Sequence, residues 1–141
     1  MPGSTGVGLV LTPIAADAMA RRRFTYVADP FGRDTWRSHA DTVLAGSPWE
    51  GDCDDLASTV LDLLGREGFP LDQRFRLLVS TTSGRVIDHM VAAGVQGGKI
   101  LILGDTFGPA YDISRMTHRG ILFQRMSEAR EGIWREGVPT A

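Results

Sequence analysis

Residues 48–57 read PWEGDCDDLA and contain Cys53, the one cysteine of the chain. An apolar run with the spacing of one helix face follows it and ends at a glycine and a proline: Leu56, Val60, Leu63 and Leu64, then Gly68 and Pro70. This pattern predicts a helix that starts at Cys53, with Asp52 as its N-cap. Asp54 and Asp55 suit the first turn, where negative charge is favourable.

The bulk composition is that of one soluble globular domain covering residues 1–141. The chain has 141 residues, 43% of them hydrophobic, which is enough for a sizeable core without disulfides. The net charge is only −2, so we expect no nucleic-acid partner. No apolar run approaches the ~20 residues that span a bilayer, so we expect no membrane partner. A single cysteine also excludes an intrachain disulfide.

The N-terminal stretch VGLVLTPIAADAMA superficially resembles a signal peptide. No positive residue precedes it, however, and Pro13 and Asp17 interrupt it. Thr12 followed by Pro13 is instead typical of a helix start and predicts a helix over about 13–23. The basic run 21–23 then reads as the solvated end of that helix.

The remaining elements predict an α+β domain. Pro30 and Gly32 indicate a turn, followed by a short helix over 35–45. Four segments have strand patterns, with turn residues TSGR and QGG between the first three: 74–81, 86–95, 99–105 and 120–126. Residues 127–137 should form a closing helix or turn. N-terminal helices followed by an antiparallel sheet are typical of the α+β class.

The turn QGG allows a test by counting. If Gln96-Gly97-Gly98 is a three-residue loop, paired positions on the two strands sum to 194. His89 and Asp105 then lie opposite each other, with Cβ atoms roughly 4.5–5.5 Å apart. A carboxylate beside an imidazole fixes the tautomer of the ring and stabilises its charged form. A slip of one residue would destroy this register.

Cys53 has three readings. A buried core thiol is the usual one. The helix N-terminus favours a thiolate nucleophile, and the Cys53 N–H could help bind an oxyanion, but the neighbouring carboxylates oppose thiolate formation unless protonated His89 outweighs them. Zinc held by Cys53, His89 and Asp105 is the third reading; no second closely spaced ligand pair supports it, so we expect no transition metal.

These residues resemble the bacterial transglutaminase-like cysteine peptidases of the papain-like superfamily. Members carry Gly-Asp-Cys-(Asp/Glu)-Asp at a helix start, here GDCDDLA; then a strand with His and apolar residues, here DHMVAAGV; then a strand ending in Asp, here ILILGD. An upstream Asp-x-Trp segment is also present, here DTWRSHADTVLAGSPWEGDC. The resemblance covers about residues 24–113 and implies a papain-like fold with the cysteine at a helix start against an antiparallel sheet.

By this resemblance Cys53 is the nucleophile, His89 the general base and acid, and Asp105 the residue that orients His89. The expected activity is hydrolysis of a peptide or protein amide through a thioester. The same machinery could transfer the acyl group to an amine, as a transglutaminase does. No obligatory cofactor is expected.

Other residues carry weaker expectations. Relatives that bind calcium use acidic residues near the cysteine, which makes Asp54 and Asp55 candidates, although helix capping explains both. Trp36 and Trp49 could wall the substrate cleft or donate an indole N–H near the oxyanion; core packing explains them equally well. His39 and His118 belong to no motif and are expected at the surface.

Three features of this chain depart from the family. Many relatives carry an export signal, which we do not find here; relatives often have Asn after the triad aspartate, where this chain has Thr106; and the chain is close to a minimal domain. The compact length resembles copies in bacteriophages or prophages, which indicates a cytoplasmic or virion-associated protein. The alternative function is therefore a non-catalytic structural or adaptor protein, such as a virion or tail component with virion protein partners.

Overall fold

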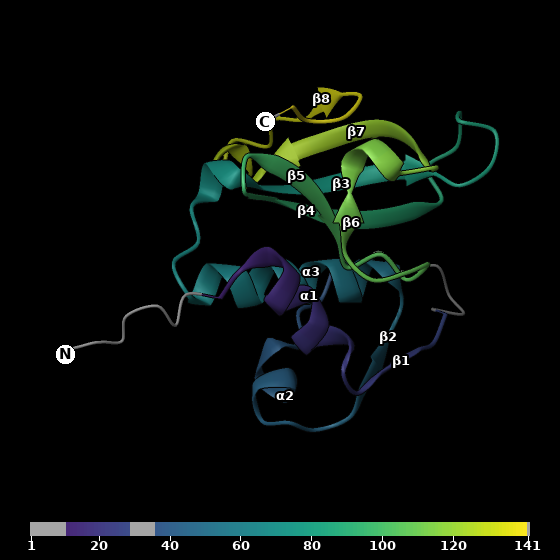
Figure 1. Ribbon diagram of the computed structural model, residues 1–141. Helices are drawn as coiled ribbons and strands as arrows, with labels where there is room; N and C mark the ends of the chain where they lie inside the picture. Colours follow the sequence, from purple (N-terminus) through teal and green to yellow (C-terminus); the bar gives the residue numbers. More distant parts are fainter. Residues whose placement is uncertain (1–10, 29–35, 141) are drawn as a thin grey trace.

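A curved antiparallel sheet lies over a layer of helices in the computed structural model, which describes residues 11–28 and 36–140 (Figure 1). The sheet has six strands in the order β6-β5-β4-β3-β7-β8. Its strands are β3 (Arg74–Ser80), β4 (His89–Gln96), β5 (Lys99–Leu103), β6 (Tyr111–Asp112), β7 (Arg119–Arg125) and β8 (Arg135–Glu136). The helices are α1 (Pro13–Arg21), α2 (Ala40–Leu44) and α3 (Cys53–Arg66). The expected α+β class is confirmed.

Helix α3 is the helix that the sequence predicts, and it begins at Cys53. The Asp52 side chain accepts from the Asp55 N–H, and the Asp55 side chain accepts from the Asp52 N–H, which makes a reciprocal capping box. Its apolar face packs under the sheet with α1, against Met90, Ala92 and Leu103. The cap and the buried face together fix where Cys53 stands.

The other N-terminal elements differ in length from the expectations. Helix α1 has the predicted Thr12 cap, whose hydroxyl accepts from the Ala15 N–H, and it ends at Arg21. Helix α2 is only five residues long, since 36–39 are not helical, and the turn expected at Pro30 and Gly32 lies outside the described residues. Two short strands that the sequence analysis missed, β1 (Phe24–Tyr26) and β2 (Trp49–Gly51), pair in parallel.

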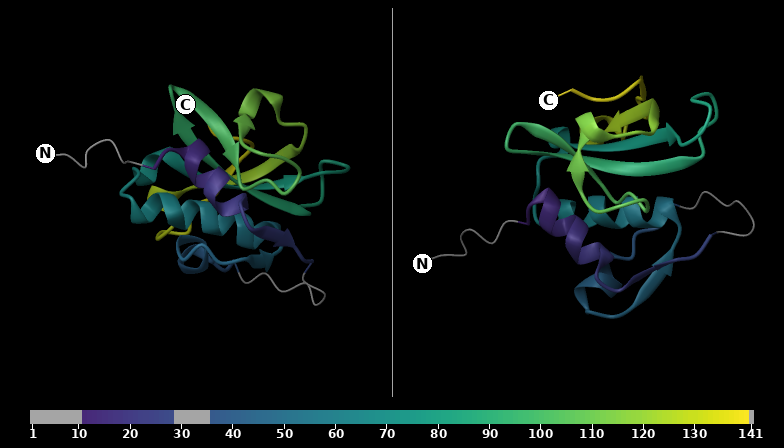
Figure 2. Two further views of the ribbon diagram at one scale, coloured as in Figure 1. Left: turned by 60° about the horizontal axis from the view of Figure 1, so that its bottom comes forward. Right: turned by 45° about the vertical axis from the view of Figure 1, so that its right-hand side comes forward.

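The two faces of the sheet bury different residues, as the alternation of a strand requires. One face packs on α1 and α3, and Figure 2 shows α1 lying across this side next to β5. The opposite face has its own apolar cluster: Phe75, Leu77, Val79, Val91, Ala93, Ile100, Ile102 and Phe123. The strands from β3 to β5 are thus covered on both sides, which explains their nearly continuous apolar character.

The turn between β4 and β5 corrects the expected register. Gln96 pairs with Lys99, so the loop has two residues, Gly97 and Gly98, not three. Both glycines have positive φ, 61° and 75°, as a type I′ turn requires. Paired positions therefore sum to 195, and Ala92 faces Leu103. Two consecutive glycines favour the tighter turn because neither pays a steric penalty at positive φ.

The strand boundaries are also shorter than predicted at the loop ends. β4 starts at His89 instead of residue 86, and β5 stops at Leu103. TSGR lies within a longer connection between β3 and β4 rather than in a tight turn. The segment 127–137 contains the end of a 3-10 turn (Met126–Glu128) and the strand β8. None of the described helices combines the length and apolar character needed to cross a membrane.

Candidate active site

The loop after β5 leaves the sheet at Gly104 and turns toward the start of α3. Gly104 has φ +61°, and a Cβ built on it would lie 2.8 Å from the Ala57 Cα. Only glycine combines this left-handed backbone with so close an approach of two main chains. The bend explains why β5 ends at Leu103 and brings the next residue, Asp105, toward β4.

His89 and Asp105 are in direct contact, as the sequence predicts. The His89 Nε2 lies 2.8 Å from the Asp105 Oδ1, and both side chains are buried. The route to this contact differs from the prediction, because the actual register would place position 106 opposite His89 if the strands continued. The bend at Gly104 replaces cross-strand pairing as the means of bringing the two side chains together.

Asp105 accepts four hydrogen bonds, two on each carboxylate oxygen. Oδ1 accepts from the Phe107 N–H (3.0 Å) besides the His89 ring. Oδ2 accepts from the Tyr111 hydroxyl (2.6 Å) and lies 2.9 Å from the His118 Nε2. Burial by itself raises the pKa of this carboxyl, but the bonds from His89, Tyr111 and Phe107 prevail and hold the pKa below its usual range. Asp105 is therefore a carboxylate at neutral pH.

Tyr111 contacts Asp105 although no sequence pattern predicted it, and His118 does not point to the surface as expected. The His118 side chain is only 7% exposed and turns inward to Asp105, although its chain segment lies between a 3-10 turn and β7. Its ring centroid lies 5.0 Å from that of His89. No periodic pattern marks either residue, because both reach the site from irregular or very short elements.

A second buried carboxylate fixes the loop that carries Asp105. Asp17, on α1, accepts from the Gly104 N–H at 2.6 Å and from the Ala110 N–H at 3.1 Å. Arg21 pairs with Asp17 and also donates to the Asp105 carbonyl oxygen at 2.7 Å. The basic run was thus wrongly placed wholly in solvent, since its first member closes this network. The i, i+4 spacing of Asp17 and Arg21 was the available signal.

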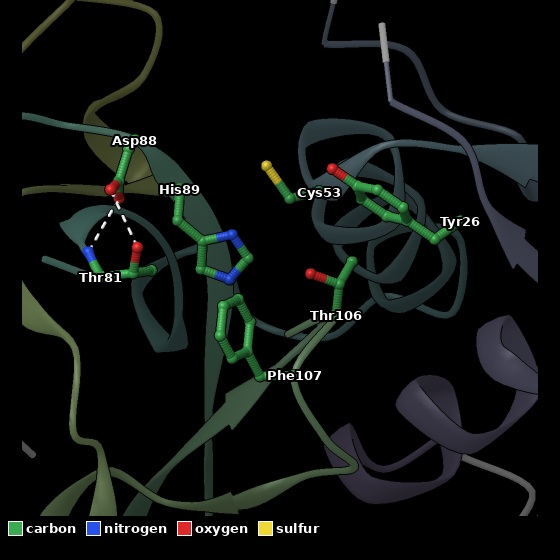
Figure 3. Close-up of a pocket in the computed structure, with 7 residues that line it drawn as sticks. All are labelled: Tyr26, Cys53, Thr81, Asp88, His89, Thr106 and Phe107. Carbon is green, nitrogen blue, oxygen red and sulfur yellow. Dashed lines mark hydrogen bonds between the residues drawn. The ribbon is translucent and has the colours of Figure 1, made fainter.

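Cys53 and His89 line the same pocket, of about 580 Å³ (Figure 3). The pocket residues are Tyr26, Cys53, Thr81, Asp88, His89, Thr106 and Phe107. Because Nε2 of His89 is directed at Asp105, the other ring nitrogen, Nδ1, is the one turned toward the side of the pocket where Cys53 lies. The Phe107 and His89 rings pack in a T-shaped arrangement, with 5.0 Å between centroids.

The surroundings of Cys53 oppose ionisation when no cation is nearby. Burial raises the pKa of the thiol to about 12, and the Asp54 carboxylate, 3.5 Å from the Sγ, adds to the rise. The Met90 N–H, which donates to the sulfur, acts in the opposite direction. Cys53 also stands at the first helical position, where its own N–H has no partner within the helix. A thiolate here requires a positive partner. A protonated His89, which lines the same pocket, would be such a partner.

Asp54 and Asp55 have different surroundings. Asp55 is engaged in the helix cap, and its other oxygen lies 3.4 Å from the Arg37 N–H, whereas Asp54 lies beside the thiol. Within residues 11–28 and 36–140, the acidic side chains at the start of α3 form no group of three converging ligands. Calcium takes six to eight oxygen ligands, and backbone carbonyls and waters can supply part of them, so Asp54 and Asp55 stay candidates for calcium.

The zinc arrangement with Cys53 is likewise not formed. In the part of the chain that is described, the group of converging metal-ligand types consists of His89, Asp105 and His118, without Cys53. Its members already hold one another through hydrogen bonds.

The two tryptophan candidates lie outside the pocket. Trp49 is buried, stacks near His39 and donates its indole N–H to the Ala20 carbonyl, so that N–H is not available for an oxyanion. Trp36 packs on the Arg76 guanidinium instead. Core and surface packing account for both. His39 is partly buried through its stack with Trp49 rather than fully at the surface.

Comparison with known proteins places the fold but not the sequence family. No family model and no curated protein matches the chain. Among solved structures, calcium-bound LapG of Legionella pneumophila superposes with a TM-score of 0.61 at 22% identity, covering 89% of this chain and 71% of that one. The EGTA-treated form of LapG gives a TM-score of 0.60 at 20% identity over 88% and 69% of the two chains. Neither match supports a phage or virion origin.

The chain therefore has the α+β fold of LapG, the papain-like, transglutaminase-like architecture that the motif resemblance implied, with N-terminal helices packed on an antiparallel sheet.

Proposed function

We propose that this protein is a cysteine hydrolase that cleaves a peptide or protein amide. The observation that carries the proposal is the orientation of His89: one ring nitrogen is fixed by Asp105, and the other faces the pocket that Cys53 lines. A nucleophile, a base and a group that orients the base are the parts that covalent acyl transfer requires. The fold shared with LapG supports the same class of chemistry.

In the proposed reaction the Cys53 proton moves to His89, and the resulting imidazolium offsets the negative charge of Asp54 beside the thiolate. The thiolate attacks the amide carbonyl carbon, and the C–N bond breaks as His89 gives its proton to the departing amine. A thioester on Cys53 is left. His89 then takes a proton from water, whose oxygen attacks the thioester, and the carboxylic acid and the Cys53 thiol are released.

The first test measures thiol reactivity, which needs no knowledge of the substrate. Because the chain has one cysteine, a single carbamidomethyl mass increase reports Cys53 alone. We expect iodoacetamide to label the folded protein well below pH 8.5, the ordinary thiol pKa, and His89→Ala to slow labelling at pH 7 by about 100-fold. His39→Ala, at a histidine away from the pocket, is the matched control and should keep the wild-type rate.

A thiol that reacts only at alkaline pH, or equally fast in His89→Ala, would reject the proposal. If labelling behaves as expected, a peptide library analysed by mass spectrometry identifies the cleaved bond. Adding a primary amine to the same reaction separates hydrolysis from acyl transfer, because only transfer gives the amine-coupled product.

A further inference from the structure

His118 is a second histidine on the carboxylate that orients His89. Its Nε2 lies 2.9 Å from Asp105 Oδ2, while the His89 Nε2 lies 2.8 Å from Oδ1. The side chains of His118 and His89 are 7% and 5% exposed, and their ring centroids are 5.0 Å apart. The two rings therefore share one buried negative charge.

A single carboxylate stabilises the first proton added to this pair of histidines far better than it stabilises a second. A first proton on either ring makes an ion pair with Asp105. A second would place two cations 5.0 Å apart around a single anion, in a site where water screens little. The protonation of His118 and that of His89 must then depend on each other.

We propose that His118 is a positioning residue that holds Asp105 for His89 and, through this shared carboxylate, couples its own protonation to that of His89. Its catalytic meaning rests on the function proposed above. By fixing Oδ2 together with Tyr111, it leaves Oδ1 aimed at His89. While His118 is neutral, the charge of Asp105 is available to stabilise the His89 imidazolium. Once His118 is protonated, the two rings compete for that charge.

The charged and titratable groups around this pair do not replace His118. Asp88 precedes His89 and lies close enough to interact with it, while Tyr111 shares Oδ2. From the helices, the groups directed at the site are Cys53 and Asp54 on α3 and Asp17 and Arg21 on α1. Asp17 and Arg21 neutralise each other and contact the loop backbone, so Asp105 is the anion that the two rings hold in common.

The same three side chains could hold a transition metal, because their ligand atoms lie within 4.8 Å of one another. In the structure, however, both rings lie at hydrogen-bond distance from Asp105, and two further donors occupy its oxygens. This saturated network favours shared protons over a metal ion, and the experiment below tests both.

The test follows the histidine ring signals of the full chain by NMR across pH, with 13C-labelled histidine. In the wild type we expect the signals of His89 and His118 each to show two steps, since the pair takes up its protons in two macroscopic stages. In His118→Gln, whose amide can still donate to Asp105, His89 should lose the step that it shares with His118, while any step caused by the Cys53 thiol remains. His39→Gln, a histidine outside the network, should leave the two-step pattern unchanged.

Independent single steps in the wild type would overturn the proposal, as would a His89 titration unaltered in His118→Gln. Stoichiometric zinc in protein purified without chelator, lost in His118→Gln, would also overturn it in favour of a metal site. If His118→Gln does not fold, the wild-type curves alone decide, because coupling is visible in them.

Labelling of Cys53 supplies the link to catalysis. Removing the donor in His118→Phe should slow iodoacetamide labelling at pH 7 roughly tenfold, the loss of one hydrogen bond to a charged group, while His118→Gln stays near the wild-type rate. If His89 and His118 titrate together but the Cys53 thiol is inert, the proposed function is rejected and the coupling between the two histidines is retained. A reactive thiol with independent histidines would reject the role of His118 alone.

Discussion

The start of α3 and the loop after β5 both bring carboxylates to the pocket, but with opposite effects. At the start of α3, Asp54 lies beside the Cys53 thiol, and with burial it raises the thiol pKa. In the loop after β5, Asp105 has four donors, one of them the His89 ring, where its negative charge favours an imidazolium. An aspartate opposes one ionisation and supports the other because a thiol ionises to an anion, whereas an imidazole ionises to a cation. A thiolate at Cys53 would therefore depend on His89 and Asp105, on the other side of the pocket.

The largest expected effect comes from removing the negative charge of Asp105. Asp105→Asn keeps the shape of the side chain but cannot stabilise an imidazolium in the same way. In a serine triad the equivalent change lowers turnover about 10⁴-fold, and a cysteine enzyme should depend on it less, so we expect a loss of about 10–1000-fold in amide cleavage. Turnover on the peptide identified above checks this. Unchanged activity in a folded variant would show that Asp105 does not orient His89.

Gly104→Ala tests whether the two regions must touch. The new Cβ would meet the Ala57 backbone at 2.8 Å and would also strain a backbone at φ +61°. We expect a loss of about 2–4 kcal/mol in the free energy of unfolding, measured by urea denaturation, together with reduced labelling of Cys53.

Gly97→Ala is the matched control, since Gly97 has the same φ of +61° with nothing within 4 Å of a Cβ. It reports backbone strain alone and should lose about 1 kcal/mol. Equal losses in the two variants would mean that the contact with α3 contributes nothing.

On the opposing side, Asp54→Asn should make the thiol more reactive. Removing this carboxylate lowers the thiol pKa, because a nearby negative charge no longer disfavours the thiolate. Labelling at pH 7 should be about 3–10-fold faster, and the rate against pH should move toward lower pH. Asp62→Asn, on the same helix but away from the thiol, is the control. A slower reaction in Asp54→Asn would show that Asp54 assists the nucleophile.

Calcium should have the smallest effect. Asp55 is engaged in the cap, and the described acidic side chains do not converge, so we expect 1 mM calcium, compared with EGTA, to shift the melting temperature by less than about 1 °C. A larger stabilisation that disappears in Asp54→Asn would show that these carboxylates gather around the ion when it is present.

Much of this site could be predicted from sequence because Cys53 lies at the start of a helix with a clear cap and a clear apolar face. The cap at Asp52 and the apolar run after Cys53 fixed the position of the cysteine. The contact between His89 and Asp105 was predicted from a register that was off by one residue. The tight two-glycine turn shifts the register by that residue, and the bend at Gly104 brings the two side chains together. Local periodicity cannot report such a bend, because it depends on the approach of a helix distant in sequence.

The residues missed by the sequence analysis share a different property. Tyr111 and His118 reach Asp105 from a two-residue strand and an irregular segment, where side-chain direction is set by tertiary packing. Trp49 shows the converse case. An indole placed near the cysteine in sequence was directed into the core, where it donates to Ala20.

The anchoring of the loop after β5 to α1 has a consequence for how the molecule opens. The Gly104 and Ala110 N–H groups both donate to Asp17, and Arg21 holds the Asp105 carbonyl, so the loop cannot leave without breaking its bonds to the first helix. Loop amides ordinarily exchange with solvent through small local fluctuations. Here the Gly104 and Ala110 amides should exchange slowly and together, in the same opening event that releases α1, and Asp17→Asn should speed both. The loop that carries Asp105 would then open together with α1, although in the chain it directly follows strand β5 of the sheet.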